Sequence, residues 1–149
     1  MKKVLAVALI TLLSATAWAA DGTLKFRIEI KSADKAGATT SVLDANTSTL
    51  PGLPTHFNKS TAQGVGDLVS IAPPPALSAT STTAPQLVTV GWNHARMVDG
   101  DKLGGSATVE RMESQNAVLL LPGKATLINT VPDKGGSETT ALYVTLVTE

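Results

Sequence analysis

The chain has 149 residues, no cysteine, and equal numbers of basic and acidic side chains. The neutral balance gives no electrostatic reason to expect a nucleic acid or an anionic membrane surface as a partner. Without cysteine there is no disulfide scaffold, no thiol nucleophile and no thiolate metal site.

Residues 1–19 are predicted to be a secretory signal peptide. Lys2 and Lys3 form a basic start, residues 4–13 are apolar apart from one threonine, and the tripeptide 17–19 places alanines where signal peptidase requires small residues. The apolar run is shorter than the ~20 residues that span a bilayer. We therefore expect Sec-dependent export from a bacterial cytoplasm, with cleavage after Ala19 and no transmembrane segment left. The mature chain, 20–149, is then a single β-rich domain in the periplasm, outside the cell or at its surface.

The first mature segment, residues 23–31, alternates apolar and charged side chains. A period of two predicts a strand with one face on the core and one in water. A second strand is predicted at 38–43. Residues 44–59 contain many turn-forming residues and are predicted to be largely turns.

The middle of the chain contains a short apolar stretch at 67–71 and then three consecutive prolines, 73–75. Proline fixes φ and lacks a backbone N–H, so no central strand is expected there. The Pro/Ser/Thr-rich segment 72–85 is predicted to be an exposed connector.

The second half returns to short apolar and alternating stretches separated by Gly/Pro turns. Strands are predicted at 87–92, 106–112, 117–121, 124–131 and 139–148. The mature chain shows no helical period, so the pattern predicts an all-β fold, an immunoglobulin-like two-sheet sandwich.

An internal echo links the two halves. Residues 50–58 and 121–129 both begin Leu-Pro-Gly and share Thr and Asn in register. Two interpretations remain open at this point. One is a duplication, giving two related strand-hairpin halves, 20–71 and 86–149, joined by 72–85. The other is a coincidence of common turn chemistry.

The sequence offers no pattern for a catalytic or metal-binding residue. His56 and His94 are the chain's two histidines, no Gly-x-Ser-x-Gly elbow fixes a nucleophile, and neither histidine has metal-ligand spacing. We therefore expect no enzyme activity and no cofactor. Trp92 and His94 are instead candidates for a loop contact with a partner.

The two ends of the mature chain, residues 20–26 and 141–147, resemble the ends of bacterial fimbrial (pilin-like) subunits. The chain lacks the cysteine pair of the commonest pilin pattern. The resemblance implies a sandwich completed by a donated strand and assembly by strand addition. The strand-pairing residues would be Leu24, Phe26, Ile28, Ile30, Leu142, Val144 and Leu146.

The expected function is thus a non-enzymatic structural or binding protein of the bacterial cell envelope, in particular a fimbrial or surface-assembly subunit. Its partners would be proteins: other copies of itself, or a chaperone. The alternative is a periplasmic enzyme inhibitor or small hydrolase that acts through an exposed loop at 73–85 or 92–96.

Overall fold

A computed structural model describes residues 22–75, 84–98, 108–133 and 135–148. Within these ranges the chain forms eight β-strands and no helix, so no described segment is a helix able to cross a membrane. The signal peptide and residues 76–83 of the predicted connector lie outside the described residues. The strands are β1 (Leu24–Asp34), β2 (Thr39–Thr49), β3 (Thr55–Ser60), β4 (Gly66–Ala72), β5 (Gln86–Val98), β6 (Thr108–Leu120), β7 (Ala125–Pro132) and β8 (Glu138–Val147).

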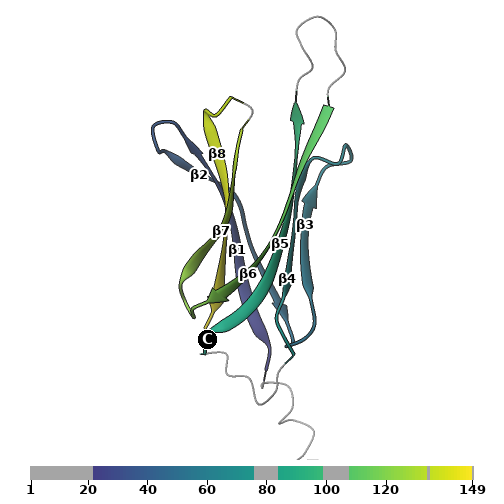
Figure 1. The fold of residues 1–149 in the computed structure, drawn as a ribbon, viewed down its shortest axis with the longest axis vertical. Helices are drawn as coiled ribbons and strands as arrows, with labels where there is room; N and C mark the ends of the chain where they lie inside the picture. The colour runs from purple at the N-terminus through teal and green to yellow at the C-terminus, as the bar shows by residue number, and fades with distance from the viewer. Residues whose placement is uncertain (1–21, 76–83, 99–107, 134, 149) are drawn as a thin grey trace, which may run out of the picture.

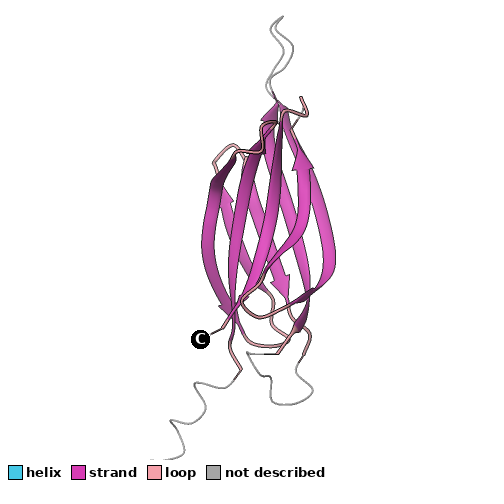
Figure 2. Cartoon of the chain, turned by 90° about the vertical axis from the view of Figure 1, so that its left-hand side faces the viewer, coloured by secondary structure: helices cyan, strands magenta, loops and turns pink. Residues whose placement is uncertain are grey.

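The strands form two antiparallel four-stranded sheets that pack face to face (Figures 1 and 2). Sheet A has the order β2-β1-β8-β7, and sheet B has the order β3-β4-β5-β6. The predicted two-sheet sandwich is confirmed. Its connectivity is an up-and-down meander in which β1 also pairs with β8, whereas an immunoglobulin-like sandwich has Greek-key connections.

The core lies between the sheets and follows from the alternation of the strands. The apolar residues of β1 point inward, and its charged residues lie on the outer face, where Glu29 is covered by its neighbours. Each buried aliphatic or aromatic side chain of this kind stabilises the fold by roughly 1.5–3 kcal/mol. The core residues are Leu24, Phe26, Ile28, Ile30, Leu43, Val69, Ile71, Val88, Val90, Trp92, Leu120, Val131, Leu142, Val144 and Leu146.

Two strand predictions need correction. Residues 44–59, expected to be mostly turns, continue β2 to Thr49 and then form β3. The threonine-rich sequence suits a half-exposed strand because threonine is β-branched. The separate strands predicted at 106–112 and 117–121 are joined, over the described residues 108–120, in one strand, β6. It pairs with β5 throughout and carries polar residues in its middle.

The two Leu-Pro-Gly segments occupy equivalent places, because each carries the chain from one sheet to the other. In each, the N–H of the residue after the glycine donates to the leucine carbonyl, at 3.0 Å in 50–53 and 3.1 Å in 121–124. Gly52 and Gly123 have φ of 80° and 71°. Proline followed by a left-handed glycine defines a type II turn. Sheet A has the order β2-β1-β8-β7. If each strand is replaced by the one four places further along the chain, counting β1 after β8, the order becomes β6-β5-β4-β3, which is that of sheet B. The duplication itself stays a prediction.

Replacing Gly52 or Gly123 with alanine should destabilise the protein by about 1 kcal/mol or more, because both need positive φ. The cost should be larger at Gly52, where an added Cβ would lie 3.3 Å from the Cα of Pro75, whereas the space around Gly123 is open. Urea denaturation measures the difference. Gly135→Ala is the control, since Gly135 has no positive φ. Equal stability of all three variants would contradict the turn assignment.

Candidate interaction surfaces

The predicted strand-pairing residues lie in the protein's own core. All seven, on β1 and β8, are at most 1% exposed. β1 is hydrogen-bonded to β2 on one side and to β8 on the other, and β8 is hydrogen-bonded to β1 and β7. Both backbone edges of each strand are therefore occupied within sheet A. In this arrangement neither strand presents a free backbone edge, so the predicted strand-pairing residues pair within their own sheet.

Trp92 and His94 also lie elsewhere than predicted, because they belong to β5 and not to a loop. Trp92 is 2% exposed. Its indole Nε1 donates to Asp67 Oδ1 at 2.8 Å, and His94 Nδ1 lies 2.8 Å from the same oxygen. Asp67 and His94 are direct cross-strand partners on β4 and β5. The two residues are not in a loop, since β5 continues to Val98 and both rings contact the buried Asp67 carboxylate. A contact with a partner stays a prediction.

An Asp–His pair can orient an imidazole for nucleophilic catalysis. Here the carboxylate oxygen is shared with an indole, and the cluster joins two strands. Ser114, directly opposite Trp92 on β6, has a buried hydroxyl with no hydrogen-bond partner, so it does not complete a triad. His56 lies apart from the cluster, on the exposed side of β3. The described residues contain no group of three or more His, Asp or Glu side chains able to hold a metal ion.

The substitution Asp67→Ala should destabilise the fold by roughly 1–3 kcal/mol, because it leaves the buried Trp92 indole N–H without its acceptor. Asp67→Asn keeps one acceptor oxygen and should cost less. Trp92 is the sole tryptophan of the predicted mature chain, so denaturation followed by its fluorescence reports the change. A cost for Asp67→Ala no greater than that of the control Asp44→Ala, at an exposed ion pair, would contradict the assigned role.

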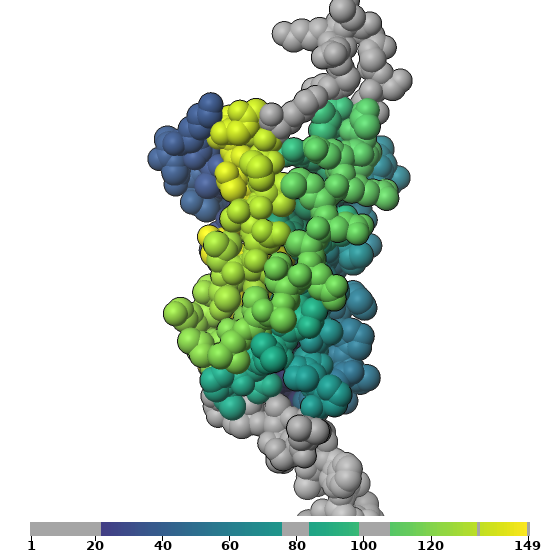
Figure 3. Space-filling model, in the orientation of Figure 1, coloured from purple at the N-terminus to yellow at the C-terminus, as the bar shows by residue number. Residues whose placement is uncertain are grey.

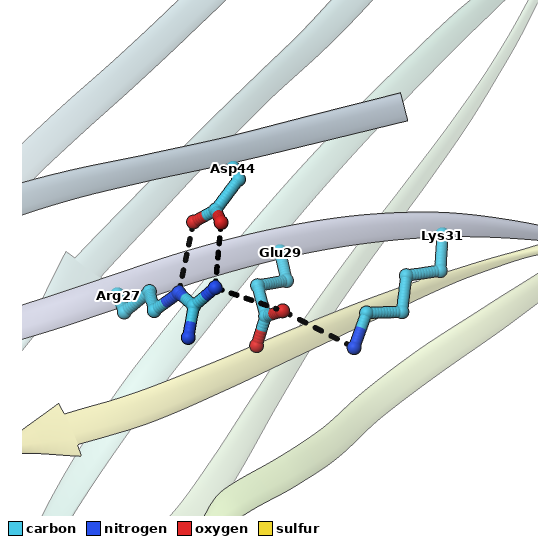
Figure 4. Close-up of polar contacts among 4 residues, drawn as sticks. All are labelled: Arg27, Glu29, Lys31 and Asp44. Carbon is cyan, nitrogen blue, oxygen red and sulfur yellow. Dashed lines mark hydrogen bonds and ion pairs between the residues drawn. The ribbon is translucent and has the colours of Figure 1, made fainter. Parts of the chain in front are cut away.

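The outer face of sheet A carries a network of charges (Figure 4). Arg27 donates to both carboxylate oxygens of Asp44, from Nε at 2.9 Å and from an Nη at 2.6 Å. Glu29 lies between Arg27 and Lys31, at 3.5 Å and 3.1 Å. Lys31 Nζ is also 5.2 Å from the centre of the Tyr143 ring. These charges have partners within the sheet.

The hydrogen bonds from Arg27 hold the pKa of Asp44 below its ordinary value of 3.8, and the same contact raises the pKa of Arg27. A lowered carboxyl pKa means that the contribution of Asp44 to stability is present above pH 3.8 and is lost as the pH falls through the lower, folded value. Arg27→Gln should move the Asp44 pKa up toward 3.8. An NMR titration of its carboxyl carbon measures this. Lys124→Gln is the control, and an unchanged Asp44 pKa in Arg27→Gln would contradict the pairing.

Among the strands that the structure describes, sheet B ends at β6 in a long edge without a neighbouring strand of its own sheet. β6 has 13 residues and pairs with β5 along its whole length. On its other side the next strand of the chain, β7, belongs to sheet A. On the outer face near the end of β6, Leu119 lies opposite Leu87, and each is 56% exposed. An unpaired strand edge presents N–H and C=O groups that can pair with another chain.

A shallow hollow of about 480 Å³ lies on the same outer face, around Gly91. An added Cβ on Gly91 would lie 2.5 Å from Ser70 Oγ, so the serine side chain would have to rotate away. Asn93 and Glu113 both line the hollow, and the Asn93 amide donates a hydrogen bond to Glu113 at 2.8 Å. Its other lining residues are Leu68, Trp92, Ser114 and Gln115. Sequence reasoning missed this feature because it depends on which strands are neighbours.

No family model matches the chain, and no match was found among curated proteins or solved structures. The resemblance to fimbrial subunits therefore stays a prediction.

Proposed function

We propose that the protein is an exported, non-enzymatic structural subunit of the bacterial cell envelope that associates with other proteins by strand addition at β6. The observation that carries this proposal is the outer edge of β6, a 13-residue strand that has no second partner strand within the described ranges. In strand addition, main-chain hydrogen bonds supply affinity, and alternate side chains supply specificity. The export step rests on the predicted signal peptide.

The opposite edge of the sandwich favours β6 over β2 or β3 as the pairing strand. There, the hydroxyls of Thr47 on β2 and Thr55 on β3 are 2.7 Å apart. Lys59 donates from β3 to the backbone carbonyl of Val42, at 3.3 Å. These contacts link β2 to β3 across that edge. β7 is a poorer template than β6, since a register shift interrupts its ladder and a proline ends it.

Association at an edge also agrees with the burial of β1 and β8. Neither strand has to leave the sandwich, so the protein folds first and assembles afterwards. The alternative, an inhibitor or hydrolase acting through a loop, has less support. Trp92 and His94 are built into β5, and the Ser114 hydroxyl is not hydrogen-bonded to the histidine.

Amide hydrogen exchange combined with light scattering tests the proposal. The mature chain, 20–149, is measured from low to high concentration. We expect a rise in molar mass together with slower exchange at those β6 amides that point away from β5. The amides of β2 serve as the internal control. A monomer at every concentration, or protection gained at β2 instead of β6, would overturn the proposal.

A further inference from the structure

We propose that the strand added to β6 is β6 of a second copy of this chain, paired antiparallel about a two-fold axis at Met112. The two B sheets would then form one continuous sheet. This inference rests on the function proposed above, and it adds the identity of the partner and the register. The interface is isologous, so residues 108–116 of one copy face the same residues of the other.

The first argument is that β6 carries two opposite charges without ionic partners. Arg111 and Glu113 are exposed and lie on the outer face, two residues apart. In the part of the chain that the structure describes, neither forms an ion pair, whereas Arg27 and Arg96 are both paired with carboxylates. Glu113 accepts a hydrogen bond from the Asn93 amide, which leaves its charge uncompensated.

The second argument is that these charges select one register. In a two-fold antiparallel pair, residues that face each other lie on the same side of the sheet. One residue must therefore face its own counterpart, and the axis passes between these two copies of it. With the axis at Met112, Arg111 of each copy faces Glu113 of the other, giving two opposite-charge pairs. An axis at 110, 111 or 113 would place Glu110, Arg111 or Glu113 against itself. Like charges that face each other across strands are destabilising, so the axis at Met112 is favoured.

The third argument is access. Besides the outer-face residues Arg111, Glu113 and Gln115, the inward-facing Glu110 is also exposed. Its carboxylate is held to Arg96 at 2.8 Å, which keeps it on its own side of the interface. Figure 3 shows residues of β6, in green, at the surface of this face of the molecule. Pairing occupies residues 108–116 of β6 in both copies, so this part of the edge cannot accept a third copy.

A charge exchange tests the register. Arg111→Glu alone and Glu113→Arg alone each place like charges at both cross-strand positions. Each should raise the dimer dissociation constant about tenfold or more, measured by sedimentation equilibrium. An equimolar mixture of the two single variants should dimerise again, because every facing pair is then of opposite sign. The double variant should also dimerise. Lys124→Glu, at an exposed residue in the following turn, is the matched control and should leave dimerisation unchanged.

Disulfide cross-linking tests the same register. Because the native chain has no cysteine, only the introduced cysteines can form a disulfide. Arg111→Cys mixed with Glu113→Cys should give a disulfide-linked heterodimer on mild oxidation. Gln115→Cys alone should not cross-link, because it faces itself only when the axis lies at residue 115. Circular dichroism confirms that each variant is folded.

Three results would overturn the inference: single charge variants that dimerise like the native chain, a mixture that stays monomeric, or a Gln115→Cys homodimer. If one of these occurs while β6 amides still gain protection, strand addition stands and the register or partner is wrong. If the protection is absent as well, both proposals fail.

Discussion

The pairing of β1 with β8 is the contact on which the rest of the sandwich depends. The ladder runs from Lys25↔Val147 to Asp34↔Glu138 and joins the first described strand to the last. Without it, sheet A would separate into two hairpins, and a two-stranded hairpin is marginally stable at best in water. The inner faces of both strands supply much of the core. The same pairing occupies the edges that a donated-strand mechanism would need, so any association of the folded chain has to use another strand.

The central strand pair of sheet B is β4 and β5, as β1 and β8 are that of sheet A. Polar side chains take part in the pairing of β4 with β5. There the buried Asp67 carboxylate contacts two side chains of β5, Trp92 and His94. A slip of one residue would turn the carboxylate to the other face of the sheet and leave the indole N–H unpaired. Apolar packing stabilises the pairing of β1 with β8 in sheet A. The pairing of β4 with β5 in sheet B has in addition a polar cluster that fixes its register.

The sequence predicted the fold class well because alternation is a local signal. In β1, every second residue is apolar (Leu24, Phe26, Ile28 and Ile30), and this alternation predicts which side of the strand faces the core. The same rule failed at residues 44–49 and 55–60, where Thr, Ser and Asn take strand positions that are also typical of turns. The interaction surfaces were predicted less well, because alternation gives the face of a residue and not its neighbouring strand. The contact between Asp67 and His94, 27 residues apart, and the free edge of β6 both depend on strand order, which no local pattern encodes.

The closure of the chain by its first and last strands also has a consequence for biosynthesis. Strand β8 lies between β1 and β7 in sheet A. The four-stranded sheet therefore cannot form until residues 138–147 have been synthesised. Pairings between distant segments form late and slowly, because their loop closure has to precede any gain from contact. A partly synthesised chain therefore cannot complete sheet A, and an unfolded chain is what a translocation channel accepts. The topology delays folding until the whole polypeptide is available, which suits a protein whose predicted leader directs it across a membrane first.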